Sequence, residues 1–129
     1  MPHITLELAP GTSEQQKFKL ATEFAKALTK AWGVPDQNIS VAIDEVSNEK
    51  PDIIVKLWPG RTDQQKHQLA EEFANVPKTF GAFSKIPVSF VEIDPEEWKE
   101  KVWNPEIAGN PGHLYKKPNY NPDTLRPVK

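Results

Sequence analysis

The sequence contains the same unit twice, and this duplication constrains the fold more than any other feature. A shift of 49 residues, without a gap, places PHITLELAPGTSEQQKFKLATEFA, which starts at Pro2, on PDIIVKLWPGRTDQQKHQLAEEFA, which starts at Pro51. The two units span residues 2–46 and 51–94, and a tail follows at 95–129. A period of this length marks a repeated supersecondary unit, so both copies are expected to fold alike.

Each unit has the pattern of a strand, a helix and a second strand. Apolar residues alternate along the opening strand of the first unit, and a Pro-Gly pair ends the opening strand of both. Ser13 with Gln16, and Thr62 with Gln65, have the spacing of a capping box, which satisfies the free amides at a helix start. The second strands are expected at residues 39–45 and 88–93.

The two helices are expected to end differently. Gly33, with Pro35 close behind, is typical of a helix C-terminus, because glycine adopts the left-handed conformation there. In the second unit Pro77 lacks the backbone amide that the helix needs, so that helix is expected to end or kink near Asn75. The copies have therefore diverged.

Two such units predict an α/β fold. Each forms a parallel strand pair with a right-handed crossover. The pairs can join into one four-stranded mixed sheet with both helices on one face, a two-layer sandwich with pseudo-twofold symmetry. We expect residues 1–129 to form a single domain. The other face of the sheet then has to be covered by the tail or by oligomerisation.

The tail is expected to wrap around this body. Asp94 as a cap and Pro95 at the first helical position predict a short helix. Large aromatic side chains that can anchor the chain on a surface follow among prolines: Trp98, Trp103, Tyr115 and Tyr120.

Composition excludes several classes of function. The formal net charge is −2, so no strong field favours a nucleic acid or an anionic membrane as partner. The absence of cysteine removes disulfides and cysteine-ligated metals, no histidine pair has metal-ligand spacing, and a reducing cytoplasm is compatible. The sequence shows no signal-peptide pattern and no apolar run near the ~20 residues that cross a bilayer. We expect a cytoplasmic protein that attracts any anionic ligand through local cations.

Pro2 is the first candidate for chemistry. It follows Met1 directly, and a small second residue permits removal of the methionine. Burial and nearby cations lower the pKa of an amine, so a free proline amine could act as a base near pH 7. Pro51, at the matching position of the second unit, is an amide within the chain. If Met1 is retained, Pro2 is a tertiary amide and cannot act as a base.

Arg61 is the second candidate. It stands between the Pro-Gly pair and the helix cap, where a guanidinium can hold a carboxylate in bidentate fashion, although such an arginine can also be a solvated loop charge. Trp58, at the end of the preceding strand, can both pack and contact a substrate. Trp98 and Trp103 favour packing.

These features together resemble the tautomerase superfamily, specifically its 4-oxalocrotonate tautomerase group. The resemblance rests on Met1-Pro2, the strand that follows, the run Pro-Gly-Arg-Thr-Asp-Gln-Gln-Lys and the βαβ length, and it covers both units. The tail segment WKEKVWNPEIAGNPGHLYKKPNY is similar to the ending of short bacterial tautomerases linked to phenylpyruvate enol–keto conversion. The resemblance implies a proline amine that moves a proton between carbon and oxygen of a small carboxylate substrate, without metal or cofactor.

Residue by residue, the resemblance implies that Pro2 is the base and that Arg61 binds the substrate carboxylate. The first unit has Thr12 in place of that arginine, so one site per chain is expected, with the second half completing the site at Pro2. The second arginine of better-known members would align with Ser40 or Ser89. The aromatic residue in the pocket of those members has no unambiguous counterpart in this sequence, and Trp98 or Trp103 could take its place. Trimers of fused chains are the superfamily expectation, whereas the tail resembles dimeric relatives, an arrangement that a fused pair could satisfy within one chain.

Two alternatives remain open at the level of sequence. On the same scaffold, hydration with dehalogenation of a haloacrylate would need a carboxylate to activate water, for which Glu7 and Glu45 are weak candidates. Alternatively, the chain could be a non-catalytic assembly module that kept the fold after duplication and lost the chemistry.

Overall fold

The computed structural model describes residues 1–46, 52–80 and 86–128, and within them both repeats form the expected unit. The first consists of β1 (His3–Leu8), α1 (Glu14–Trp32), a short 3-10 turn (Asp36–Asn38) and β2 (Ser40–Glu45). The second consists of β3 (Asp52–Leu57), α2 (Asp63–Phe80) and β4 (Val88–Glu92).

One mixed sheet joins the two units, in the order β4-β3-β1-β2-β5. Each repeat contributes a parallel pair, β1 with β2 and β3 with β4, and the antiparallel pairing of β1 with β3 connects them. The predicted α/β fold class is confirmed, but the prediction of four strands was wrong by one. The tail adds β5 (Leu114–Lys116), antiparallel to β2. An outer strand leaves backbone amides and carbonyls unpaired, and here the tail pairs with those of β2.

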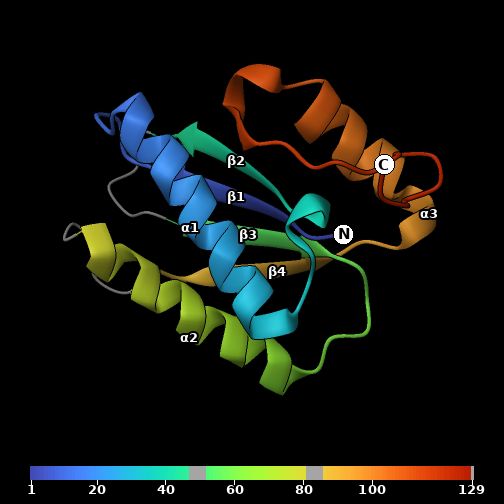
Figure 1. Ribbon diagram of the computed structural model, residues 1–129, viewed down its shortest axis with the longest axis horizontal. Helices are drawn as coiled ribbons and strands as arrows, with labels where there is room; N and C mark the ends of the chain where they lie inside the picture. The colour runs from blue at the N-terminus through green and yellow to red at the C-terminus, as the bar shows by residue number, and fades with distance from the viewer. Residues whose placement is uncertain (47–51, 81–85, 129) are drawn as a thin grey trace.

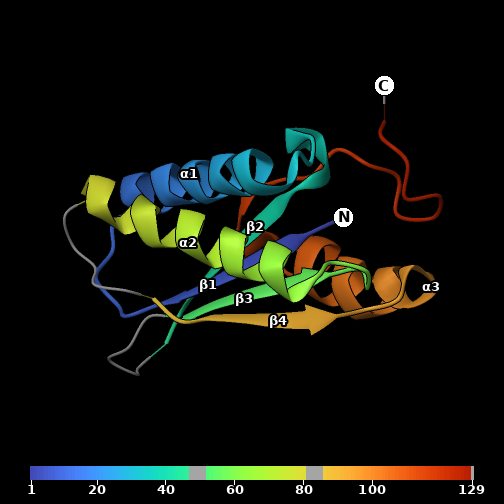
Figure 2. The same ribbon diagram turned by 90° about the horizontal axis from the view of Figure 1, so that it is seen from below.

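Both helices cover one face of the sheet, as Figures 1 and 2 show. The alternating residues Ile4, Leu6 and Leu8 of β1 are buried in the core beneath them. The two helices meet through Phe24 and Phe73, whose rings contact edge to face with centroids 5.1 Å apart. The apolar stripe of each helix is thus matched to the apolar side of the sheet.

The helix starts follow the capping pattern. Ser13 accepts a hydrogen bond from the Gln16 amide at 3.2 Å, while Thr62 and Gln65 cap each other reciprocally, with bonds of 2.9 and 3.1 Å. Gly33 ends α1 with a φ of 70°, as expected.

Of the two outcomes expected for α2 near Asn75, an end or a kink, the end was wrong, because the helix continues through Pro77 to Phe80. A proline near the C-terminus removes only one backbone hydrogen bond. Just before it, Phe73 and Val76 are buried in the core and hold this part of the helix on the sheet.

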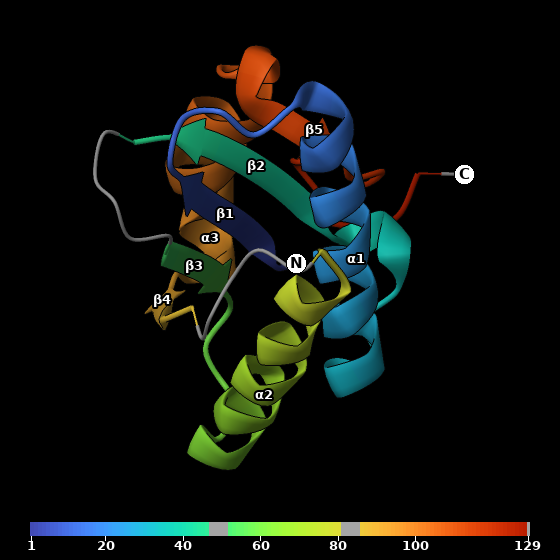
Figure 3. The ribbon, with the colours of Figure 1, turned by 90° about the vertical axis from the view of Figure 1, so that its left-hand side faces the viewer.

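The tail covers part of the opposite face of the sheet. It forms α3 (Pro95–Trp98), a π-helical segment η2 (Lys99–Ala108) and a 3-10 turn η3 (Pro111–His113) before β5. Figure 3 shows α3 on the far side of the sheet from α1 and α2. The prediction of a wrapping tail is confirmed. Of the tail and oligomerisation, the two ways expected to cover this face, the tail covers part of it.

Trp98 is the centre of a second apolar cluster that fixes the tail. Its side chain is completely buried, and its indole N–H donates to the Tyr120 hydroxyl at 2.9 Å. Burial raises the pKa of Tyr120 to about 12. The other buried members of the cluster are Ile93, Val102 and Ile107. Among the described helices, none combines the length and the apolar character needed to cross a membrane.

Candidate active site

The antiparallel pairing of β1 with β3 creates the candidate site. His3 is opposite Lys56, so the residues before His3 lie beside those that follow Lys56 along the chain. Pro2 is thereby brought next to Trp58 and the loop that leads to α2. In that loop Gly60 has a φ of 120°, a conformation that L side chains rarely adopt, and the chain turns there to direct Arg61 inward.

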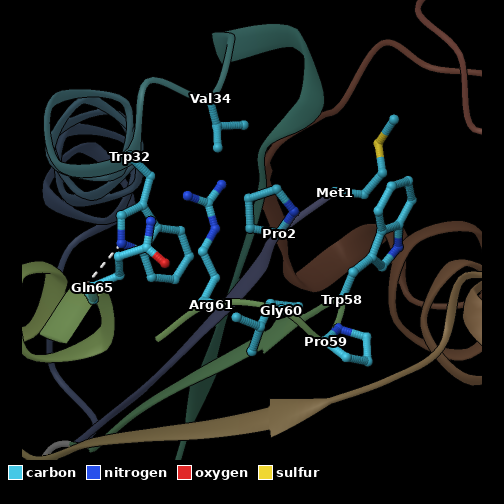
Figure 4. Close-up of a pocket in the computed structure, with 10 residues that line it drawn as sticks. Met1, Pro2, Trp32, Val34, Trp58, Pro59, Gly60, Arg61 and Gln65 are labelled. Carbon is cyan, nitrogen blue, oxygen red and sulfur yellow. Dashed lines mark hydrogen bonds between the residues drawn. The ribbon is translucent and has the colours of Figure 1, made fainter. Parts of the chain in front are cut away.

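A pocket of about 320 Å³ opens at this point. Four segments contribute to it: the start of β1, the end of α1, the loop after β3 and the first turn of α2. Figure 4 shows the Arg61 guanidinium pointing into the pocket between Trp32 and Pro2. The lining residues are Met1, Pro2, Trp32, Val34, Leu57, Trp58, Pro59, Gly60, Arg61 and Gln65. Three of the residues predicted from sequence, Pro2, Trp58 and Arg61, are therefore in one pocket.

The electrostatics of the pocket favour a neutral amine and an anionic ligand. The chain's α-amino group, on Met1, has its pKa lowered from 8.0 to about 6, first by burial and then by the nearby Arg61 charge. No described carboxylate is within ion-pair distance of Arg61, and no aspartate or glutamate lines the pocket. The guanidinium instead lies over the Trp32 ring, 4.5 Å from its centroid.

Trp98 and Trp103 do not line this pocket. Trp98 is buried behind Trp58, and the two indoles meet edge to face with centroids 6.4 Å apart. Trp103 packs on Tyr120 in the tail cluster, with centroids 5.2 Å apart. Trp98 therefore supports the wall of the pocket from behind, and Trp58 is the one of these three tryptophans that lines it.

The positions aligned with a second arginine are also elsewhere. Ser40 is buried in β2, where its hydroxyl lies 2.6 Å from Nδ1 of His3, and Ser89 is exposed on β4. Thr12, the counterpart of Arg61, follows the far end of β1. Pro51, the counterpart of Pro2, lies outside the described residues. Arg61 is thus the one side-chain cation among the residues that line the pocket.

A polar network anchors the tail next to Pro2, and sequence reasoning missed it. Glu106, in η2, contacts Lys56 at 2.7 Å and lies 3.2 Å from Nε2 of His3, a contact whose geometry falls short of a hydrogen bond. Burial opposes ionisation of the Glu106 carboxyl, but His3 and Lys56 together outweigh it and lower its pKa below 4.5. The Pro2 carbonyl accepts from the Ser40 amide at 3.3 Å, so the network and the backbone together fix the start of β1.

Trp32, Val34, Leu57 and Gln65 line the pocket although the sequence did not suggest them as site residues. Trp32 and Val34 flank Gly33 at the end of α1, and Gln65 was recognised only as part of a helix cap. In the sequence, Trp32 could be recognised only as a residue at the end of a helix. That pattern does not show which other element the end of the helix contacts. No group of three histidine, aspartate or glutamate side chains among the described residues is arranged to hold a metal ion.

Comparison with known proteins identifies the family of this chain. The sequence profile of the family described as "Tautomerase enzyme" matches residues 2–50, which include the first repeat. A probable tautomerase of Bacillus cereus is 38% identical over 47 residues, a match that covers 36% of this chain and 77% of the relative. This chain belongs to the tautomerase family.

Solved structures share the fold of this tautomerase-family chain over a longer stretch. A fused 4-OT wild-type asymmetric trimer superposes with a TM-score of 0.65 and 20% identity, covering 73% of this chain and 88% of the other. A macrophage migration inhibitory factor-like protein of Entamoeba histolytica superposes with a TM-score of 0.67 and 18% identity, covering 75% and 92%. The fused tautomerase fold therefore accounts for both repeats.

Proposed function

We propose that this chain is a cofactor-free enzyme that interconverts the enol and keto forms of a 2-oxo acid, with the Pro2 amine as general base and acid once Met1 has been removed. The observation that carries the proposal is the position of the chain's N-terminal segment in one pocket with an arginine that has no carboxylate partner among the described residues. The tautomerase names of its relatives support the same reaction type.

The pocket supports the role of the base. Removal of Met1 would leave a secondary amine on Pro2, a buried residue beside the same arginine. The two causes that lower the pKa of the Met1 amine, burial and the Arg61 charge, would act on the proline amine too. A lowered pKa favours the neutral form of that amine, which can take the proton from an enol oxygen and return a proton to the neighbouring carbon.

The pocket also limits the substrate. One guanidinium matches one carboxylate, which it can hold through two parallel N–H donors. Trp58, Val34 and Leu57 give the lining an apolar part that suits the rest of a monocarboxylate. A dicarboxylate would need a second cation, and the lining has none on a side chain.

Tautomerisation fits the pocket better than hydration. The hydration route was expected to use a carboxylate to activate water, and neither Glu7 nor Glu45 is among the lining residues. Glu45 is engaged instead with Lys17, at 2.6 Å. A neutral amine without a carboxylate nearby supports proton transfer within one substrate.

Oligomerisation is a further part of the proposal. β4 is the outer strand of the sheet, and Val91 on it is 41% exposed. Strands with free edges pair readily with another chain. We propose a homo-oligomer, a trimer or a dimer of fused chains, and light scattering at several concentrations would show whether the chain is instead a pseudo-dimeric monomer.

The decisive experiment combines intact mass with one substitution. The purified chain should lack the mass of Met1 and should convert phenylpyruvate enol to the keto form. Pro2→Ala should lower this activity by about 100-fold or more, the usual contribution of a general acid–base group, with the fold retained. Pro51→Ala, at the matching position of the other repeat, is the control. Retained Met1 in an active chain, or equal losses in both variants, would refute the role of Pro2.

A further inference from the structure

Among the described residues, one side chain restrains the Arg61 guanidinium, an aromatic ring from the other repeat. Its guanidinium carbon lies 4.5 Å from the centroid of Trp32, and the described residues offer it no ion pair. A long side chain on a loop loses considerable rotamer freedom when it is held in one geometry. Stacking on an indole restrains the guanidinium plane without using its N–H groups.

Trp32 itself is fixed on two sides. Its indole N–H donates to the backbone carbonyl of Gln65, in the first turn of α2, at 2.9 Å. Its ring also packs on Phe90 of β4, with centroids 6.4 Å apart. The ring is thus tied to the second repeat at two points, close to the loop that carries Arg61, and Figure 4 shows the two side chains together on one wall of the pocket.

The matching pair of positions in the two repeats lacks both the arginine and the tryptophan. The shift of 49 residues that aligns the repeats sets Arg61 on Thr12 and Trp32 on Gly81. The end of the first helix has therefore acquired an indole where the second repeat has acquired the arginine. Divergence at both positions is what a pair that works as a unit would require.

We propose that Trp32 is a positioning residue of the carboxylate site: its ring holds Arg61 so that the guanidinium N–H groups face the pocket. This inference rests on the proposed binding of a carboxylate by Arg61, but not on the role of Pro2. An arginine that is already oriented loses less freedom when it binds a carboxylate, so affinity is higher. The first repeat thereby shapes the specificity of a site whose charge comes from the second.

A double-mutant cycle on carboxylate binding tests the proposal. Calorimetry with phenylpyruvate measures Kd for the wild type, Trp32→Leu, Arg61→Ala and the double variant. Trp32→Leu should weaken binding by about 2- to 30-fold, the range that a cation–π contact supplies, and should have no further effect in the Arg61→Ala background. Trp32→Phe, which keeps a ring and most of the volume, should stay within about 3-fold of the wild type. If the Leu variant does not fold, the same cycle with Trp32→Met, which also removes the ring, keeps the test decisive.

A spectroscopic signature separates positioning from packing. The chain has two arginines, so the guanidinium signals of Arg61 and Arg126 can be assigned by substitution. The Arg61 protons should be shifted upfield by the indole in the free protein and should lose that shift in Trp32→Leu. Trp103→Leu, the same exchange in the tail cluster, should change neither Kd nor the signal.

Two outcomes would overturn the proposal: wild-type affinity in Trp32→Leu, or an equal loss of affinity with and without Arg61. Absence of measurable phenylpyruvate binding by the wild type would also overturn it. If the double-mutant cycle shows the expected coupling but the chain has no enol–keto activity, Trp32 keeps its positioning role and only the proposed function is refuted.

Discussion

Replacing Arg61 by alanine is the most informative perturbation of the pocket. No described carboxylate pairs with Arg61, so replacing the arginine leaves no carboxylate without its partner. The free energy of unfolding should therefore change little. A hydrogen-bonded charge pair with the substrate contributes about 1.5–3 kcal/mol. At 1.36 kcal/mol per tenfold, Arg61→Ala should lower kcat/KM for a 2-oxo acid by about 10- to 200-fold, mainly through KM.

The same substitution should move the pH profile. The Arg61 charge is the second cause, after burial, of the lowered pKa of the terminal amine. Removing the cation favours the protonated amine, so the pKa should rise and the acid limb of kcat/KM should shift to higher pH. If Arg61 is only a solvated loop charge, Arg61→Ala should change neither kcat/KM nor the pH at which its acid limb lies.

The assay follows the absorbance of phenylpyruvate enol between pH 5 and 9, in the wild type and three variants. Arg61→Lys should recover part of the loss, because an ammonium supplies charge without the planar fork. Arg126→Ala removes an exposed cation in the tail and should behave like the wild type. If Arg61→Ala converts the enol with wild-type kcat/KM, the assignment of the carboxylate site is wrong.

Three further predictions follow from the other described contacts. First, kcat/KM of the wild type should rise with pH as the terminal amine loses its proton, and burial with the Arg61 charge, which lower the pKa of the Met1 amine, should place this rise at a lower pH than for a solvated amine; a profile flat from pH 5 to 9 would contradict this. Second, the pKa of Glu106 is lowered in the folded chain, so its contribution to stability is present above about pH 4.5 and is lost as the pH falls through the lowered value. Urea unfolding of Glu106→Gln should therefore show a weaker acid dependence than the wild type, and identical slopes would mean that the network does not stabilise the fold. Third, Trp98→Ala should cost about 3–5 kcal/mol in urea unfolding, because it empties the buried centre of the tail cluster, while Trp103→Ala should cost clearly less; equal losses would show that burial does not set the difference.

Much of the architecture could be predicted from local patterns. The capping pairs at Ser13 and Thr62 and the stop at Gly33 were read correctly, because each depends on hydrogen bonds between residues close in sequence. The duplication predicted two equal units and, through them, a mixed sheet. Pro77 misled the prediction, since packing of the preceding residues outweighed one lost backbone bond.

The candidate site was predictable only in part. Pro2, Trp58 and Arg61 stand at junctions that the repeat pattern reveals, and the fold brings all three into one pocket. Trp98 and Trp103, also considered as substrate contacts, pack in the tail cluster, because an aromatic residue in sequence gives no sign of which surface it will meet.

What the sequence determined by itself is the repeated unit, the starts of its two helices and the divergence of its two copies. What the tertiary structure decided is where the tail lies and which residue of the first repeat meets Arg61. Trp32 and Gln65, bonded across 33 residues, illustrate the difference. A cap forms wherever its few residues occur, whereas this contact exists only because the sheet joins β1 to β3 and thereby fixes where the end of one helix meets the start of the other.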